Sequence, residues 1–144
     1  MKRGLEIAAL AALLGGCAPT ARPPAEARPS VRKDPCAERL HEISGHLLLY
    51  VSTHKELPAT AERFRAWCGP DLPPLVCPAS GRPYAYNPAG IPLPHLAGRM
   101  VLYDAGPTHH GMRWGILVSG SPGGGGLVAK VVLVAEKDLP LTVR

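Results

Sequence analysis

The chain has 144 residues, which is enough for one domain. Its formal net charge of +5 comes from basic residues spread along the sequence, with no compact basic patch interleaved with aromatic residues, so we expect no nucleic-acid partner. Hydrophobic residues make up 46% of the chain, but Pro (17) and Gly (16) together form nearly a quarter of it. This composition favours a small, loop-rich domain joined to a stiff linker.

The N-terminal segment predicts export. Lys2 and Arg3 precede an apolar run, residues 5–14, that is too short to span a bilayer. The run ends in Leu14-Gly15-Gly16-Cys17, which resembles the lipobox of bacterial lipoproteins. The resemblance implies that residues 1–16 are a signal peptide and that the new N-terminal residue, Cys17, is lipidated. Three acyl chains on one residue would form a lasting membrane anchor.

The lipobox resemblance also implies a location. We expect the chain in the cell envelope, attached to a membrane through its lipid anchor and facing the periplasm. Ala18 follows the lipidated cysteine where an Asp favours retention in the inner membrane, so the outer membrane is the expected one. Residues 17–35 then form a tether, because five of the 18 residues after Cys17 are Pro and such a segment is extended.

Helical periodicity begins where the tether ends. Asp34-Pro35 is typical of a helix start, with Asp as the N-cap and Pro at the first helical position. Apolar residues then recur every three or four positions and predict an amphipathic helix of about 20 residues that ends before Pro58: Cys36, Leu40, Ile43, Leu47, Tyr50 and Val51. A shorter helix is predicted over residues 60–68, with Phe64 and Trp67 in the core.

After Gly69 the pattern changes to short strands separated by turn signals. The predicted strands cover residues 83–87, 99–104, 112–119 and 127–136. A helix followed by successive strands predicts an α+β domain over residues 36–144, with one long N-terminal amphipathic helix packed on a small antiparallel sheet.

Three motifs carry a second resemblance. The helical run Cys36-x3-Leu40-x2-Ile43-x3-Leu47-x2-Tyr50-x3-His54 is followed by Leu57-Pro58. Cys77-Pro78 then precedes Tyr84-Ala85-Tyr86, and Val101-Leu102-Tyr103-Asp104 precedes residues 109–117. In order and spacing these motifs resemble the pseudopilin-like proteins of the type II secretion G type. In place of a prepilin peptidase site, this chain has the lipobox signal.

The pseudopilin resemblance implies a pseudopilin-like fold and a non-catalytic domain that binds other envelope proteins, as an accessory to a type II secretion or pilus-like machine. The sequence motifs also argue against catalysis. No nucleophile elbow, phosphate-binding loop or pair of carboxylates placed for acid–base chemistry is present, so we expect neither enzyme activity nor a cofactor.

Three cysteines remain beside Cys17, an odd number for an oxidising compartment. We favour a Cys68–Cys77 disulfide, because Gly and Pro residues between the two can bring them together. The rival pairing is Cys36–Cys77, which would tie the start of the long helix to the sheet.

The segment His109-His110-Gly111 is expected to be a loop between two strands, with its histidines packed on Tyr103 or Trp114. The alternative is a metal site whose ligands come from His109, His110, His95 and Asp104. Adjacent residues of an extended chain point to opposite sides, so only one of the two adjacent histidines would easily face inward. The alternative function is therefore a metal- or thiol-binding periplasmic lipoprotein that uses His109, His110 and Cys36.

Overall fold

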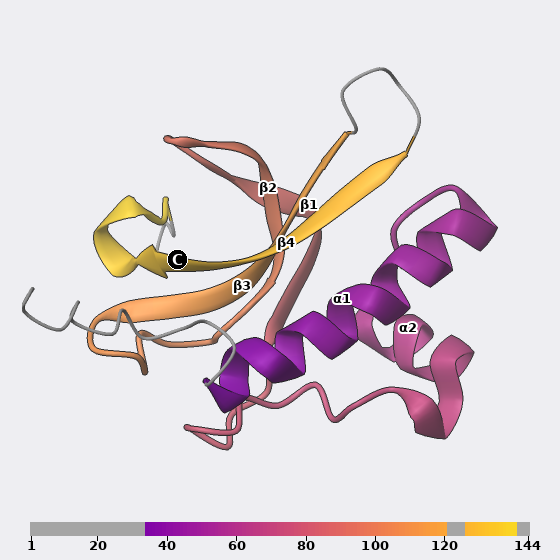
Figure 1. Ribbon diagram of the computed structural model, residues 1–144, viewed down its shortest axis with the longest axis horizontal. Helices are drawn as coiled ribbons and strands as arrows, with labels where there is room; N and C mark the ends of the chain where they lie inside the picture. The colour runs from indigo at the N-terminus through magenta and orange to yellow at the C-terminus, as the bar shows by residue number, and fades with distance from the viewer. Residues whose placement is uncertain (1–33, 121–125, 141–144) are drawn as a thin grey trace, which may run out of the picture.

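The computed structural model describes residues 34–120 and 126–140 (Figure 1). The expected signal peptide, the lipidation site Cys17 and the tether as far as residue 33 lie outside the described residues. No helix within the described part of the chain is long and apolar enough to cross a membrane.

The longest helix, α1, runs over Pro35–His54. Asp34 caps it, since its carboxylate accepts hydrogen bonds from the backbone N–H groups of Cys36 and Ala37 at 2.8 and 3.4 Å. Lys55 ends the helix in the left-handed conformation, at φ 64°. One face of α1 is buried and consists of Cys36, Ala37, Leu40, Ile43, Ser44, Leu47 and Tyr50.

Four antiparallel strands follow in a meander whose spatial order is the chain order. They are β1 (Ala85–Leu93), β2 (Leu96–Tyr103), β3 (Met112–Gly120) and β4 (Leu127–Ala135). The predicted α+β class is thereby confirmed at the level of a four-stranded antiparallel sheet with two helices. Strand β1 is longer than the sequence predicts, because an edge strand tolerates the prolines that follow Tyr86 and a bulge lies between Tyr86 and Ile91.

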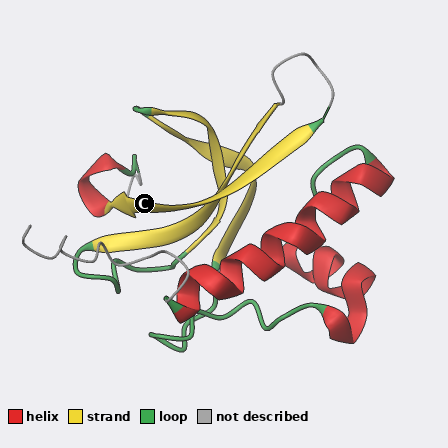
Figure 2. Cartoon of the chain, in the orientation of Figure 1, coloured by secondary structure: helices red, strands yellow, loops and turns green. Residues whose placement is uncertain are grey.

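Figure 2 shows the sheet with helix α1 crossing it. An apolar cluster lies on each face of the sheet. Helix α1 crosses one face and packs on β3 and β4. Its buried residues meet Val101, Ile116 and Val118 there. The opposite face is covered by the C-terminal 3-10 turn η3 (Glu136–Asp138) and the residue after it, and holds a second cluster made of Leu93, Met100, Leu117, Val134 and Leu139.

Helix α2 (Ala61–Cys68) lies beside the C-terminal half of α1, with the short turn η2 (Gly69–Asp71) after it. Thr60 caps α2 by accepting the Arg63 N–H at 3.1 Å. Phe64 is fully buried, whereas Trp67 is 38% exposed. The expectation that both aromatic residues belong to the core is therefore correct for Phe64 only.

Candidate functional site

The opening of β3 is a two-residue hairpin turn. His109 and Met112 exchange both of their backbone hydrogen bonds, at 3.2 and 3.1 Å. The two residues between them, His110 and Gly111, have positive φ values of 53° and 79°, as a type I′ turn requires. The turn places the His109 ring against the protein and leaves His110 exposed to solvent.

Asp104 directly follows β2 and faces the start of β3. Its backbone N–H donates to the Trp114 carbonyl at 2.9 Å, and its Oδ2 accepts the Trp114 N–H at 2.8 Å. The carboxylate is 1% exposed, and its Oδ2 lies 3.2 Å from His109 Nε2. The other carboxylate oxygen, Oδ1, is buried without any hydrogen-bond partner among the described residues.

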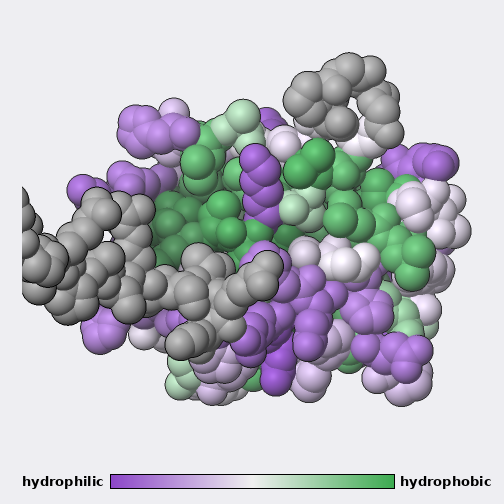
Figure 3. Space-filling model, in the orientation of Figure 1, coloured by the Kyte–Doolittle hydropathy of each residue, from purple (hydrophilic) through white to green (hydrophobic). Residues whose placement is uncertain are grey.

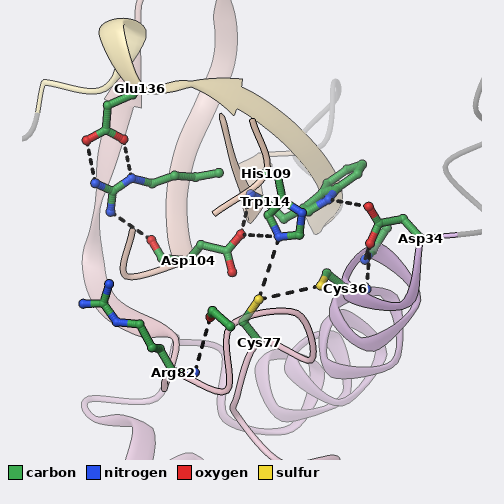
Figure 4. A network of polar contacts seen from close by, with 11 residues as sticks. Asp34, Cys36, Cys77, Arg82, Asp104, His109, Trp114 and Glu136 are labelled. Carbon is green, nitrogen blue, oxygen red and sulfur yellow. Dashed lines mark hydrogen bonds and ion pairs between the residues drawn. The ribbon is translucent and has the colours of Figure 1, made fainter. Parts of the chain in front are cut away.

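Cys77 lies in a tight turn before β1. Its N–H donates to the Arg82 carbonyl at 2.9 Å, and its carbonyl accepts the Gly81 N–H at 2.8 Å. This turn places the Cys77 sulfur 3.8 Å from His109 Nε2 and 3.6 Å from the Cys36 sulfur. Figure 4 shows the two sulfur atoms, the His109 ring and the Asp104 carboxylate facing one another.

Cys36 enters this group from the first turn of α1, and it is fully buried. Burial raises the pKa of its thiol, and the adjacent Cys77 raises it further, while the Ala79 N–H that faces the sulfur lowers it. The start of α1 is held in place by Asp34, which also accepts a hydrogen bond from the Trp114 indole N–H at 3.1 Å. Cys36 is therefore a fixed, buried thiol whose pKa lies above that of an exposed cysteine.

Tyr84 adds a second unpaired polar atom. Its hydroxyl is buried and has no hydrogen-bond partner among the described residues. Burial raises the pKa of this phenol, and its electrostatic interactions with Cys77 and Asp104 raise it further. Tyr84 Oη and Asp104 Oδ1 are both buried without a hydrogen-bond partner among the described residues, and native proteins leave few such atoms.

We call Cys36, Cys77 and His109 the thiol–imidazole cluster. One ligand atom from each of the three lies within 4.8 Å of the other two. Tetrahedral zinc with Zn–S bonds of about 2.3 Å and Zn–N bonds of about 2.05 Å separates two sulfur ligands by about 3.8 Å and a sulfur from a nitrogen by about 3.6 Å. The two sulfur atoms are 3.6 Å apart and the Cys77 sulfur lies 3.8 Å from His109 Nε2, each within about 0.2 Å of the separation expected for that pair. The cluster therefore has the size and the donor atoms of sites that bind zinc and similar thiophilic cations.

The cysteine pairing favoured from the sequence does not match this arrangement. The fold brings Cys77 against Cys36, not against Cys68, which is half-buried at the end of α2. The reason is the turn at Cys77, which directs its sulfur under the first turn of α1. At 3.6 Å the Cys36 and Cys77 sulfur atoms are in contact but unbonded, and all three cysteines are free.

Of the four histidine and carboxylate residues that the sequence suggests as metal ligands, only two lie at the cluster. His109 and Asp104 lie at the cluster, whereas His110 and His95 are exposed and outside it. Sequence reasoning missed the combination of Cys36, Cys77 and His109, because the three come from distant segments and lack the short spacing of a recognisable zinc motif. Two observations from the sequence, taken together, could have indicated the cluster. They are the rival Cys36–Cys77 pairing and the expectation that one of the two adjacent histidines faces inward.

Comparison of the chain with models of known protein families, with curated proteins and with solved structures gives no match.

Proposed function

We propose that this chain is a lipid-anchored envelope protein whose domain binds a thiophilic divalent cation, zinc above all, through Cys36, Cys77 and His109. The observation that carries the proposal is the convergence of two sulfur atoms and one imidazole nitrogen within 4.8 Å of one another. Two thiolates and one imidazole form a frequent zinc ligand set.

Burial makes a bound cation the natural state of such a cluster. Cys36 and Cys77 are at most 1% exposed, and the Asp104 carboxylate beside them is 1% exposed. Taking charged groups out of water is unfavourable unless an opposite charge compensates them. A divalent cation would offset the charge of two thiolates in this buried setting.

The membrane part of the proposal rests on the sequence. Leu14-Gly15-Gly16-Cys17 has the residue types and spacing of a lipobox, and a Pro-rich segment separates it from Asp34. Replacing Cys17 with Ser should move the protein from the membrane fraction to the soluble periplasmic fraction. Continued membrane attachment of this variant would contradict the lipid anchor.

The metal proposal is tested on the full-length chain, purified from membranes in detergent without added metal or chelator. Elemental analysis should find one equivalent of zinc per chain. Cys36→Ser, Cys77→Ser and His109→Asn should each lose the metal, because each removes one of three ligands. Cys68→Ser and His110→Asn are the matched controls, since they change the same residue types outside the cluster and should retain it.

A disulfide between Cys36 and Cys77 is the result that would contradict the metal proposal. A protein that carries no metal and whose mass is that of a Cys36–Cys77 disulfide would overturn the metal proposal and leave a structural disulfide in its place. Equal metal content in His109→Asn and His110→Asn would overturn it too, because binding would then not depend on the inward-facing ring.

A second function, non-catalytic binding of other envelope proteins by a pseudopilin-like domain, is favoured by the apolar surface over the sheet. Figure 3 shows hydrophobic residues gathered there, above the hydrophilic surface of α1. Leu96 and Leu133 are 43% and 38% exposed, and β4 is an edge strand with no further partner among the described strands. Exposed apolar residues beside an open strand edge are typical of surfaces that bind proteins.

This second function is tested by crosslinking in intact cells and purification of the tagged, lipidated protein. Recovery of secretion or pilus components should fall when Leu133 is replaced with Lys, which adds a charge to β4 without touching the thiol–imidazole cluster. Equal recovery by the wild type and by an unrelated lipid-anchored control would contradict the interaction.

A further inference from the structure

Resting on the proposed metal binding, we infer that Asp104 is the fourth ligand and that the site is a closed, structural zinc centre that joins α1 to the sheet. Three protein ligands alone would leave an open coordination position, as in catalytic zinc sites. The difference decides whether the bound ion holds the fold together or offers a position to an outside molecule.

The first argument is geometric. A nitrogen and an oxygen bound to the same tetrahedral zinc are about 3.3 Å apart. His109 Nε2 and Asp104 Oδ2 are 3.2 Å apart, so the ring and the carboxylate already lie as close together as two ligands of one ion. Asp104 is not among the residues whose ligand atoms all lie within 4.8 Å of one another, so its side chain must move toward the two sulfur atoms to bind the same ion.

The second argument is the unpaired oxygen. Asp104 Oδ2 is held by the Trp114 N–H at 2.8 Å, whereas Oδ1 is buried without a partner among the described residues. A buried carboxylate with one oxygen anchored and the other unpaired leaves a polar atom that has lost its water and gained no partner. Metal ligation by one oxygen, with the Trp114 hydrogen bond on the other, would satisfy both.

The third argument is charge. Two thiolates and one carboxylate around a divalent ion leave one negative charge in excess. The positive N-terminal end of α1 lies at Cys36, the Ala79 N–H faces the Cys36 sulfur, and the Trp114 N–H binds Asp104. These dipoles favour the anionic four-ligand site over a neutral three-ligand site that keeps a water molecule.

The ligands also come from three separate segments: the first turn of α1, the turn at Cys77 and the β2–β3 hairpin. A cavity of about 450 Å³ lies at the other end of α1, beside Leu57, Val101 and Leu127, and none of the proposed ligands lines it. The ion would thus lie where three segments meet, in the position of a cross-link.

The test uses the full-length protein in detergent, with its zinc exchanged for Co²⁺, whose visible absorption reports coordination. The wild type should give the intense bands of a four-coordinate thiolate site, and added azide should not change them. Asp104→Asn keeps an oxygen that can accept the Trp114 N–H but loses the anionic ligand. It should bind Co²⁺ more than about tenfold more weakly and should show a spectral change with azide. Asp71→Asn, a change of the same type at an exposed position, should behave as the wild type.

The wild-type azide titration keeps the inference falsifiable even if Asp104→Asn does not fold. A spectral change with azide in the wild type, or an Asp104→Asn protein with unchanged affinity and spectrum, would overturn the closed site while leaving metal binding intact. A wild-type protein that binds neither zinc nor Co²⁺ would overturn the proposed function itself.

Discussion

The two ends of α1 are attached to the rest of the domain by different chemistry. At the C-terminal end, Tyr50 lies edge-on to Phe64 and Trp67, with ring centroids 6.1 and 5.2 Å apart, and His54 stacks on Tyr50 at 4.1 Å. At the N-terminal end, Cys36 meets Cys77, His109 and Asp104. The first end is complete as an apolar contact, whereas the second includes a buried carboxylate oxygen, Asp104 Oδ1, without a hydrogen-bond partner among the described residues.

This difference indicates at which end of α1 the stability of the attachment depends on solution conditions. Aromatic packing needs only the protein itself, and its strength follows from the area removed from water. With the proposed ion bound, the polar end would gain much of its strength from a ligand that must be supplied and can be withdrawn. A chelator should therefore weaken the N-terminal attachment of α1 and leave the C-terminal attachment unchanged.

The largest expected effect is at the aromatic end. Phe64→Ala should lower the free energy of unfolding by about 3–5 kcal/mol, because Phe64 is 1% exposed and its removal leaves a cavity. Urea unfolding with zinc and with chelator should show the same loss in both. Trp67→Ala, at a residue 38% exposed, should cost clearly less, and an equal cost would show that burial does not set the strength of this end.

Asp34 gives the next effect, at the polar end. Asp34→Ala removes the cap of α1 and the acceptor of the Trp114 indole N–H, and should cost about 1–2 kcal/mol. The measurement is chemical unfolding of both proteins in chelator, where the cap acts without an ion. Thr60→Ala, which removes a cap that accepts one N–H on the exposed start of α2, should cost less. A larger cost for Thr60→Ala would contradict this ranking.

A smaller loss of stability is expected at Pro58, which follows the aromatic end of α1 and accepts a hydrogen bond from Tyr86. The Tyr86 hydroxyl donates to the Pro58 carbonyl at 2.6 Å, so Tyr86→Phe should lower the unfolding free energy by about 0.5–1.5 kcal/mol. Thermal unfolding followed by circular dichroism measures the loss. Tyr103→Phe is the comparison, because Tyr103 is also a partly buried tyrosine of the sheet but takes no part in the Tyr86–Pro58 hydrogen bond, and its replacement should cost less.

The smallest effect lies away from both ends and depends on pH. The hydrogen bond from Arg113 lowers the pKa of Glu136, whose side chain is 43% exposed. The contribution of the pair, under about 1 kcal/mol, is present above the unfolded-state pKa near 4.3 and is lost as the pH falls through the lower folded-state value. Glu136→Gln should be less stable than the wild type at pH 7, and the difference should vanish in acid. A difference that persists in acid would contradict the ion pair as its cause.

Local signals in the sequence account for much of this fold. Asp34-Pro35 indicates a helix start because capping and fixed φ act within a few residues, and α1 begins there. Thr60 indicates the start of α2 for the same reason. The sequence predicts only the start of strand β1. The segment that follows contains prolines and lacks local strand propensity, so its pairing with β2 depends on the rest of the sheet.

The site was harder to predict than the fold. Adjacent His109 and His110 indicate that one ring faces inward, but not which one, because that depends on the I′ turn at His110 and Gly111. The Cys68–Cys77 preference weighed only the short loop between the two cysteines. The fold instead brings together sulfur atoms 41 residues apart, through the packing of α1 over the sheet.

The position of Asp34 has a mechanical consequence. If residues 17–33 link the domain to a lipid, any pull from the membrane enters the domain at the first turn of α1, beside Asp34 and Cys36. That load would act on the helix cap, the indole hydrogen bond and the proposed metal ligand Cys36 before it reaches the aromatic packing at the far end. The resistance of the first turn of α1 to such a pull would then depend on the proposed coordination bonds of a single ion.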